Sequence, residues 1–171
     1  MVTNNIPSKY KNIQLWDKGK HGLVYKAQYK TQDVAIKVKL PSSKSQNTSL
    51  LEGNYLKHVN KLGIGPKLIE TTENYVVMEF IDGTRIDKFL EKATQREISK
   101  VIKAILKQLE LLDETGINKM EMKNPYKHII VKKDLTPVLI DFERSRFTTK
   151  PKNISQFKEY LKKHQLDFSC I

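Results

Sequence analysis

Short apolar runs that alternate with polar positions dominate the first half of the chain. They are rich in Val, Ile and Tyr and are separated by Gly, Asp and Thr, a pattern typical of β-strands. We therefore predict that the first half is mainly β-sheet. The predicted strands are residues 13–16, 23–29, 34–40, 67–70 and 75–81.

One helical pattern interrupts these strands. Ser49 and Glu52 are spaced as in a capping box, which predicts that a helix begins there. Gly63 predicts where this segment ends. The predicted apolar face consists of Leu51, Tyr55, Leu56 and Val59.

The second half is predicted to be mainly helical, after a break at Asp82-Gly83-Thr84. Its longest helix begins with a second capping box, Thr94 with Glu97, and ends before Gly116. One apolar stripe follows this helix: Ile98, Val101, Ile102, Ile105, Leu109 and Leu112.

Shorter elements flank this long helix. A helix is predicted at 87–92, strands are predicted at 128–132 and 137–142, and Asn153 is predicted to cap a final helix. The apolar face of that final helix consists of Ile154, Phe157, Tyr160 and Leu161.

Two features of the predicted sheet suit phosphate binding. The turn from Gly19 to Gly22 lets backbone amides approach phosphate oxygens without a Cβ in the way, although most such turns are ordinary hairpins. In the strand Val34-Ala35-Ile36-Lys37, alternation places Ala35 and Lys37 on one face. Lys37 could then serve phosphates below an adenine-sized slot, or it could simply face solvent.

Two acidic residues complete the candidate site. Glu52 is the only acid between Pro41 and Ile69, so it is the one carboxylate of that segment available to a buried lysine, unless it serves only the capping box. Asp141 follows an apolar strand, where an acid is costly unless it binds a cation or caps a turn. We predict that Asp141 is a Mg²⁺ ligand.

Five features of the chain, taken in order, resemble the protein kinase signature set. They are the glycine turn, Lys37, Glu52, the hinge strand 77–80 and Asp141-Phe142-Glu143. The resemblance covers residues 13–161. It is to small atypical kinases, namely the RIO type and the kinase subunit of the tRNA-threonylcarbamoylation complex. It is closer still to short archaeal predicted Ser/Thr kinases, through the segments Gly63–Lys67, Pro125–His128 and Pro151–Asn153.

This resemblance implies an α+β fold, a minimal bilobal protein-kinase-like fold. A β-rich N-lobe with one helix would span 1–81, and a truncated helical C-lobe would span 82–171. ATP and Mg²⁺ would bind between the lobes, with Lys37 on the phosphates and Glu52 orienting it. The other expected nucleotide-binding residues are Gly19, Gly22, Val24, Ala35, Met78, Glu79, Ile130 and Ile140.

The chain departs from the kinase motifs at two glycines and in the catalytic loop. Asp17 replaces the first glycine of the glycine loop, and Glu143 replaces the last glycine of Asp-Phe-Gly. Lys119-Met120-Glu121-Met122 resembles His-Gly-Asp-Leu, which makes Glu121 the candidate catalytic base.

The spacing after this loop leaves a second alignment open. His128 stands where the motif has its metal-binding Asn, but it is seven residues after Glu121 and not five. Counting back five residues places Lys123 at the base position, and a charged lysine cannot accept a proton. With Glu121 as the base, Asn124 and His128 become candidate metal or phosphate ligands.

The net charge widens the choice of partners. The 171 residues carry 31 Lys and Arg against 19 Asp and Glu, and residues 117–163 alone carry 12 against 5. A basic surface favours polyanions such as phosphates or RNA, whereas the alternative is a lysine-rich surface shared with the rest of a lysine-rich proteome.

Composition also excludes several classes of protein. The chain is 39% hydrophobic and 29% charged, and no apolar run approaches the roughly 20 residues of a membrane span. Cys170 is the single cysteine, so no disulfide framework or cysteine zinc site is expected. With no secretory pattern at the start, we expect a cytoplasmic protein that does not bind membranes.

Three functions remain on these grounds. The first is an atypical ATP-dependent protein kinase or ATPase, acting on a protein substrate or on itself. The second is a pseudokinase scaffold that binds nucleotide without turnover. The third is a switch protein associated with RNA, a ribosome or a tRNA-modification complex through its basic surface.

Overall fold

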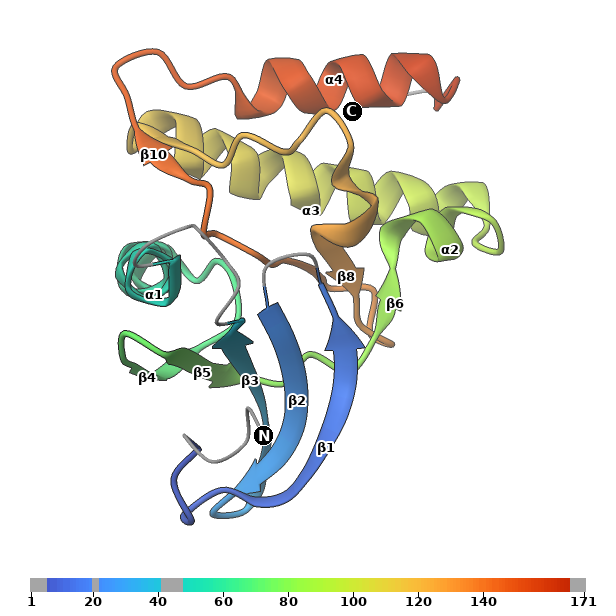
Figure 1. The fold of residues 1–171 in the computed structure, drawn as a ribbon. Helices are drawn as coiled ribbons and strands as arrows, with labels where there is room; N and C mark the ends of the chain where they lie inside the picture. Colours follow the sequence, from blue (N-terminus) through green and yellow to red (C-terminus); the bar gives the residue numbers. More distant parts are fainter. Residues whose placement is uncertain (1–5, 20–21, 41–47, 167–171) are drawn as a thin grey trace.

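A five-stranded antiparallel sheet forms most of the first half of the chain (Figure 1). The computed structural model describes residues 6–19, 22–40 and 48–166. The strand order is β1-β2-β3-β5-β4, so each hairpin-connected strand lies beside its neighbour in sequence, and β5 inserts between β3 and β4. The strands are β1 (Lys11–Lys18), β2 (Gly22–Tyr29), β3 (Gln32–Lys39), β4 (Leu68–Thr71) and β5 (Tyr75–Glu79).

The central strand β3 shows the predicted alternation. Val34, Ile36 and Val38 are fully or almost fully buried on one face of the sheet, in a core of their own. Ala35 and Lys37 are on the other face, and Ala35 packs with Met78 against the second, larger core. The face that carries Lys37 is therefore the face toward the second half of the chain.

The helix α1 (Thr48–Val59) packs against β3, β4 and β5 and leads into the short 3₁₀ helix η2 (Asn60–Leu62). Its buried face carries Ser49, Glu52 and Leu56, whereas Leu51 is 44% exposed. Since Thr48 is already helical, Ser49 is not at the N-cap, and the predicted capping box with Glu52 is wrong. The placement of Leu51 on the apolar face is wrong as well.

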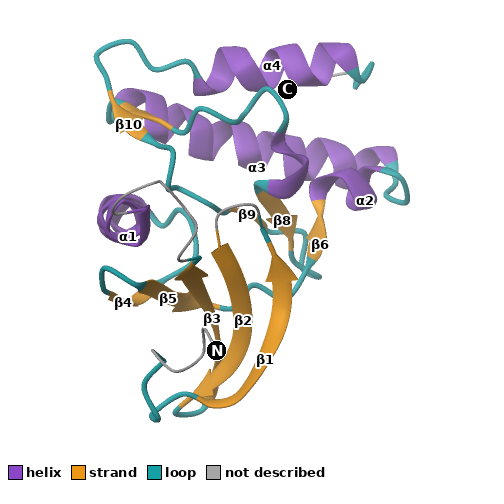
Figure 2. Cartoon of the chain, in the orientation of Figure 1, coloured by secondary structure: helices purple, strands orange, loops and turns teal. Residues whose placement is uncertain are grey.

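The second half consists of helices and two small sheets (Figure 2). The predicted capping box of Thr94 and Glu97 is present at the start of the longest helix, and all six residues of its predicted apolar stripe are buried. The helices are α2 (Ile86–Leu90), α3 (Gln95–Glu114), η3 (Pro125–Lys127) and α4 (Asn153–Lys163). The strands are β6 (Thr84–Arg85), β7 (Ile117–Asn118), β8 (Ile129–Val131), β9 (Pro137–Leu139) and β10 (Arg146–Phe147).

The start of α4 differs from the prediction. Asn153 is the first residue of the helix and not its cap, and Lys152 at the N-cap makes no side-chain cap bond. Asp113 at the end of α3 takes this role, because its carboxylate accepts hydrogen bonds from the backbone N–H groups of Asn153 (3.1 Å) and Ile154 (3.2 Å). The buried side chain of Asn153 instead accepts a hydrogen bond of 2.7 Å from the backbone N–H of Lys119.

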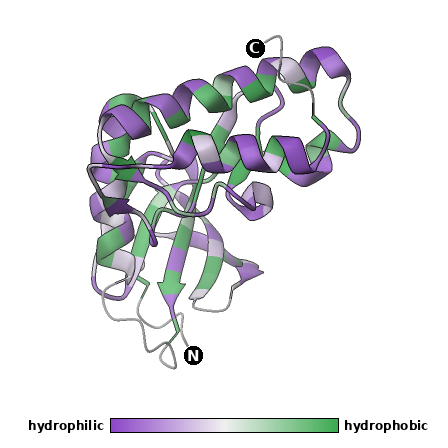
Figure 3. Cartoon of the chain, turned by 90° about the horizontal axis from the view of Figure 1, so that it is seen from above, coloured by the Kyte–Doolittle hydropathy of each residue, from purple (hydrophilic) through white to green (hydrophobic). Residues whose placement is uncertain are grey.

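One apolar core contains residues of both halves of the chain, which the segment 80–83 links. Figure 3 shows hydrophobic and hydrophilic bands alternating along the long helices, as expected when each has one buried face. A Cβ on Gly83 would lie 2.4 Å from the carbonyl oxygen of Val131, so the link passes too close to β8 for any side chain. The shared core includes Leu56, Val76, Met78, Ile86, Ile105, Ile129 and Phe142.

Within the described residues, no helix is long and apolar enough to cross a bilayer.

Candidate active site

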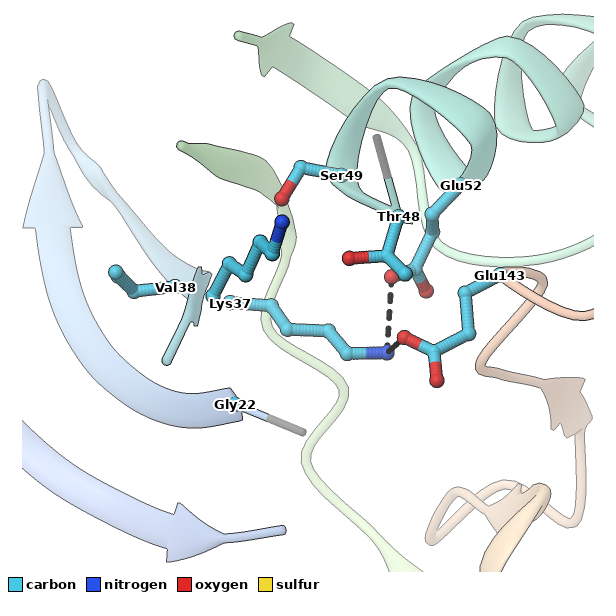
Figure 4. A pocket seen from close by; sticks show the side chains of 8 residues that line it. Gly22, Lys37, Val38, Thr48, Ser49, Glu52 and Glu143 are labelled. Atoms are coloured by element: carbon cyan, nitrogen blue, oxygen red, sulfur yellow. Dashed lines mark ion pairs between the residues drawn. The ribbon is translucent and has the colours of Figure 1, made fainter. Parts of the chain in front are cut away.

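Lys37 is the centre of an ion cluster between the two halves (Figure 4). Its Nζ lies 2.9 Å from one carboxylate oxygen each of Glu52, Asp141 and Glu143. Burial alone would lower the pKa of Lys37, but the three carboxylates outweigh it and raise the pKa above its ordinary value. Lys37 is therefore charged and held in place at neutral pH.

Glu52 links this cluster to the second half through the backbone. Its side chain is almost fully buried, and its Oε1 accepts a hydrogen bond of 3.3 Å from the backbone N–H of Phe142. Burial raises the pKa of Glu52, and the charge of Lys37 opposes this rise. The only acid of its segment thus contacts both the β3 lysine and the segment that carries Asp141.

Asp141 has an unusual backbone. Its φ is 64°, in the left-handed region that non-glycine residues seldom adopt, and the strain persists because neighbouring contacts hold it. One of these contacts is a hydrogen bond of 2.8 Å from Nζ of Lys119 to the carbonyl oxygen of Asp141. Burial would raise the pKa of Asp141, but Lys37 prevails and lowers it, so the carboxylate is ionised.

Lys119 is fully buried, which is rare for a lysine. Its Nζ lies 4.9 Å from the centre of the Phe142 ring, in addition to its bond to Asp141. Burial lowers the pKa of Lys119 to about 8, although Asp141 and Glu121 oppose the shift. This side chain supports the strained Asp141 from inside the second half.

Glu121 and His128 form a second cluster beside Asp141. Oε2 of Glu121 lies 3.3 Å from Nδ1 of His128, and this nitrogen lies 3.9 Å from Oδ2 of Asp141. On its other side, Oε1 of Glu121 accepts a hydrogen bond of 3.3 Å from Arg144. Burial raises the pKa of Glu121, whereas burial and Lys119 lower the pKa of His128 to about 4. The imidazole is therefore neutral at neutral pH.

These side chains fit a divalent cation. The ligand atoms of Glu121, His128 and Asp141 lie within 4.8 Å of one another, as do those of Glu52, Asp141 and Glu143. Oε2 of Glu121 and Nδ1 of His128 are buried and have no hydrogen-bond partner among the described residues. Carboxylate oxygens are the ligands that Mg²⁺ prefers, so the cluster of Glu52, Asp141 and Glu143, which offers oxygens alone, suits that ion.

Asn124, predicted beside His128 as a metal ligand, has a different partner. It is exposed, and its Oδ1 accepts a hydrogen bond of 3.2 Å from the hydroxyl of Tyr126. Lys123, the rival for the base position, is exposed too and forms an ion pair of 2.9 Å with Glu159 of α4. Of the residues weighed for the catalytic loop, the structure brings Glu121 and His128 together with Asp141.

The glycine turn is described only in part, since Lys20 and His21 lie outside the described residues. The backbone N–H of Gly19 donates a hydrogen bond of 2.9 Å to the carbonyl of Gly22. A Cβ on Gly22 would lie 2.7 Å from the carbonyl oxygen of Val38, so close packing of β2 on β3 requires glycine there.

The remaining predicted nucleotide-binding residues extend from Lys37 toward the link. Val24 pairs with Lys37 across β2 and β3, and Ala35 pairs with Met78 across β3 and β5. At the end of β5, Glu79 forms an ion pair of 3.2 Å with Lys132. Two further residues are near the link and the second cluster: Ile130, beside Gly83, and Ile140, whose N–H bonds to the carbonyl of His128.

Three side chains of the site were not among the predicted site residues. Lys119, Glu143 and Arg144 each contact a predicted site residue directly. Glu143 was visible in the sequence as a departure from the glycine of the motif. Nothing in the sequence pattern indicates that Lys119 is buried, because the surrounding loop has no periodicity.

Comparison with known proteins places this chain in a family. A family model for the RIO domain matches residues 20–163. The chain belongs to the RIO domain family. The RIO resemblance inferred from the sequence is thereby confirmed, and a kinase or ATPase fold follows from it.

Two individual proteins illustrate the relationship. A probable serine/threonine-protein kinase of Dictyostelium discoideum is 31% identical over 117 residues, which are 62% of this chain and 17% of that protein. The Rio2 kinase of Chaetomium thermophilum, solved as an ADP/Mg²⁺-phosphoaspartate complex, matches with a TM-score of 0.69 and 14% identity. That match covers 90% of this chain and 54% of the Rio2 chain, and it confirms the predicted α+β kinase-like fold.

Proposed function

We propose that this protein binds Mg-ATP and transfers its γ-phosphoryl group, as an atypical protein kinase or as an ATPase. The observation that carries the proposal is the position of Lys37, which Glu52 from α1 and Asp141 from the second half hold at the junction. A fixed, charged lysine between two acids suits the recognition of phosphates, because catalysis of phosphoryl transfer is mainly positioning and charge neutralisation.

Each residue has a role in this proposal. Lys37 binds the α- and β-phosphates, and Glu52 keeps it oriented. Asp141 holds Mg²⁺, and that ion, when bound, would offset the negative charge of the phosphates. Glu121 is the group that accepts the proton of an attacking hydroxyl, because it is the half-buried carboxylate beside Asp141.

The phosphoryl acceptor differs between the two forms of the reaction. In the kinase form, a Ser or Thr hydroxyl attacks the γ-phosphorus, its proton passes to Glu121, and ADP leaves. In the ATPase form, an oxygen of Asp141 attacks instead, the bond between the γ-phosphorus and the bridging oxygen breaks, and water later releases phosphate from the acyl phosphate. The phosphoaspartate named for the Rio2 complex supports this second form.

The test is incubation of the purified chain with γ-labelled ATP and Mg²⁺, with Lys37→Ala as the control. We expect label on the protein or as free phosphate, and a loss of both in the control. Hydroxylamine removes label from an acyl phosphate and leaves a phosphoserine or phosphothreonine intact, so it separates the two forms. Absence of label, free phosphate and ATP binding would contradict the proposal.

A nucleotide-binding scaffold without turnover is the second candidate. The bond from Arg144 to Oε1 of Glu121 favours it, because it occupies an oxygen that could accept the substrate proton. In that case ATP would still stabilise the fold, by about 2.7 kcal/mol at a hundredfold excess over Kd, while no phosphate is released. A thermal shift with ATP, combined with the absence of transferred label and free phosphate in the same protein, would identify the scaffold.

A further inference from the structure

We propose that Glu143 competes with nucleotide phosphates for Lys37, so that a nucleotide must displace this carboxylate to reach the lysine. The proposal rests on the nucleotide binding proposed above. Glu143 stands at the position where the kinase motif has a glycine, which has no side chain. The proposal therefore predicts that phosphates bind more weakly here than they would with a glycine at this position.

The first argument is the number of hydrogen-bond donors on Lys37. A lysine ammonium has three N–H donors. Three carboxylate oxygens, from Glu52, Asp141 and Glu143, already lie 2.9 Å from Nζ, as many as the ammonium has N–H groups, and the oxygen of Asp141 accepts a hydrogen bond. A phosphate oxygen can bind Lys37 directly only if one of these carboxylates leaves.

The second argument identifies which carboxylate can leave. Glu52 is also bonded to the backbone N–H of Phe142, and Asp141 is held through its backbone by Lys119. Glu143, by contrast, has a single side-chain partner among the described residues, namely Lys37, with which it forms an ion pair. Its displacement breaks one ion pair, whereas displacement of either of the others also disturbs the segment 141–142.

The third argument is space. The cavity beside Lys37 is lined by Gly22 and Ser49 as well as by Glu52 and Glu143, and its volume is about 10 Å³. This is about the volume that one water molecule needs, and a phosphate group is larger. Figure 4 shows Lys37 and Glu143 extending toward each other from opposite sides, so Glu143 fills the approach to Nζ.

The fourth argument is charge. Three carboxylates surround one ammonium, so the immediate surroundings of Lys37 are net negative and repel another anion. A glutamine at position 143 keeps the size of the side chain and removes its charge. It also forms a weaker bond to Lys37, because hydrogen bonds to a charged acceptor are the stronger ones.

The experiment compares ATP and adenosine binding by calorimetry in wild type and Glu143→Gln. We expect Kd for ATP to fall about tenfold, the scale of one charged hydrogen bond, while Kd for adenosine, which has no phosphates, stays the same. Glu143→Gly should give the same direction if the glutamine variant fails to fold, and Glu143→Asp, which keeps the charge, should bind ATP as weakly as wild type.

Two controls separate direct competition from a general charge effect. In a Lys37→Ala background, Glu143→Gln should improve ATP binding by less than about twofold, because the contested donor is gone. Asp82→Asn removes an exposed charge near the link and should leave Kd for ATP unchanged. A tenfold gain that persists without Lys37 would overturn the proposal.

The remaining outcomes are also decisive. Equal or weaker ATP binding by Glu143→Gln overturns the competition and leaves the proposed function standing. Binding of ATP by neither wild type nor any Glu143 variant overturns both. Binding by the variants alone supports both and shows that Glu143 keeps nucleotide out of the wild-type site.

Discussion

The two halves of the candidate site are built in different ways. Lys37 and Glu52 belong to a strand and a helix, whose backbone hydrogen bonds lie within the regular elements. Glu121 and Asp141 belong to loops in which Met120 and Asp141 have positive φ values of 72° and 64°. The half made from regular elements keeps the residues of the kinase motifs, and the loop-built half contains most of the departures. The residues of this chain thus differ from the kinase motifs mainly in the loops, where the backbone conformation depends on tertiary contacts.

The largest expected effect is a loss of turnover on substitution of Glu121, in the loop-built half of the site. If Glu121→Gln removes the proton acceptor, turnover should fall by about 10²- to 10⁴-fold, with ATP affinity nearly unchanged. Steady-state kinetics and calorimetry measure the two quantities. Lys123→Ala is the matched control, because Lys123 is exposed and paired with Glu159. Full turnover in Glu121→Gln would show that the loop-built half does not supply the base.

A smaller effect is expected at Lys119, whose amine supports Asp141. Lys119→Met keeps the length of the side chain but removes the hydrogen bond to the carbonyl of Asp141, so we expect turnover to fall about tenfold. The free energy of unfolding at pH 7 should fall by about 1–3 kcal/mol, because the carbonyl oxygen of Asp141 loses its hydrogen-bond donor. Lys107→Met on the exposed side of α3 is the control. Unchanged turnover would contradict a supporting role for Lys119.

A third effect is a pH dependence of stability due to His128. Its pKa in the folded chain is about 4 because of burial, against about 6.5 in an unfolded chain. Between these values only the unfolded chain binds the proton, so the free energy of unfolding falls as the pH is lowered, by at most about 1.4 kcal/mol per unit.

Denaturant unfolding from pH 7 to 4.5 measures this dependence. In His128→Asn the contribution should disappear, and the stability curve should be flatter than that of wild type. Parallel curves for the two proteins would show that burial of this imidazole does not contribute to acid sensitivity.

The regular elements were largely predictable from the sequence, because their signals are periodic and local. The stripe of α3 occupies six positions at helical spacing, and all six are buried. Two of the errors concern helix starts. Ser49 with Glu52 has the spacing of a capping box, and Asn153 is a good capping residue, but tertiary partners take Glu52 and Asn153 away from these local roles. A local motif cannot reveal such a competitor.

The catalytic loop could be predicted only as a choice of alignments. Counting residues left Glu121 and Lys123 open, because a loop has no period that fixes its register. The structure places the carboxylate of Glu121 against His128 and leaves Lys123 at the surface. The burial of Lys119 depends on β7, α4 and the segment 141–142 together, and no single stretch of sequence contains that information.

The bond between Asn153 and the backbone of Lys119 has a consequence for the order of events during protein synthesis. Every strand of the large sheet has been synthesised once residue 79 has emerged, so this sheet can pair before the rest of the chain exists. The loop at Lys119, by contrast, lacks a partner for its buried N–H until Asn153 has left the ribosome, 34 residues later. The sheet that holds Lys37 can thus form during translation before the loop at Lys119 reaches its final position.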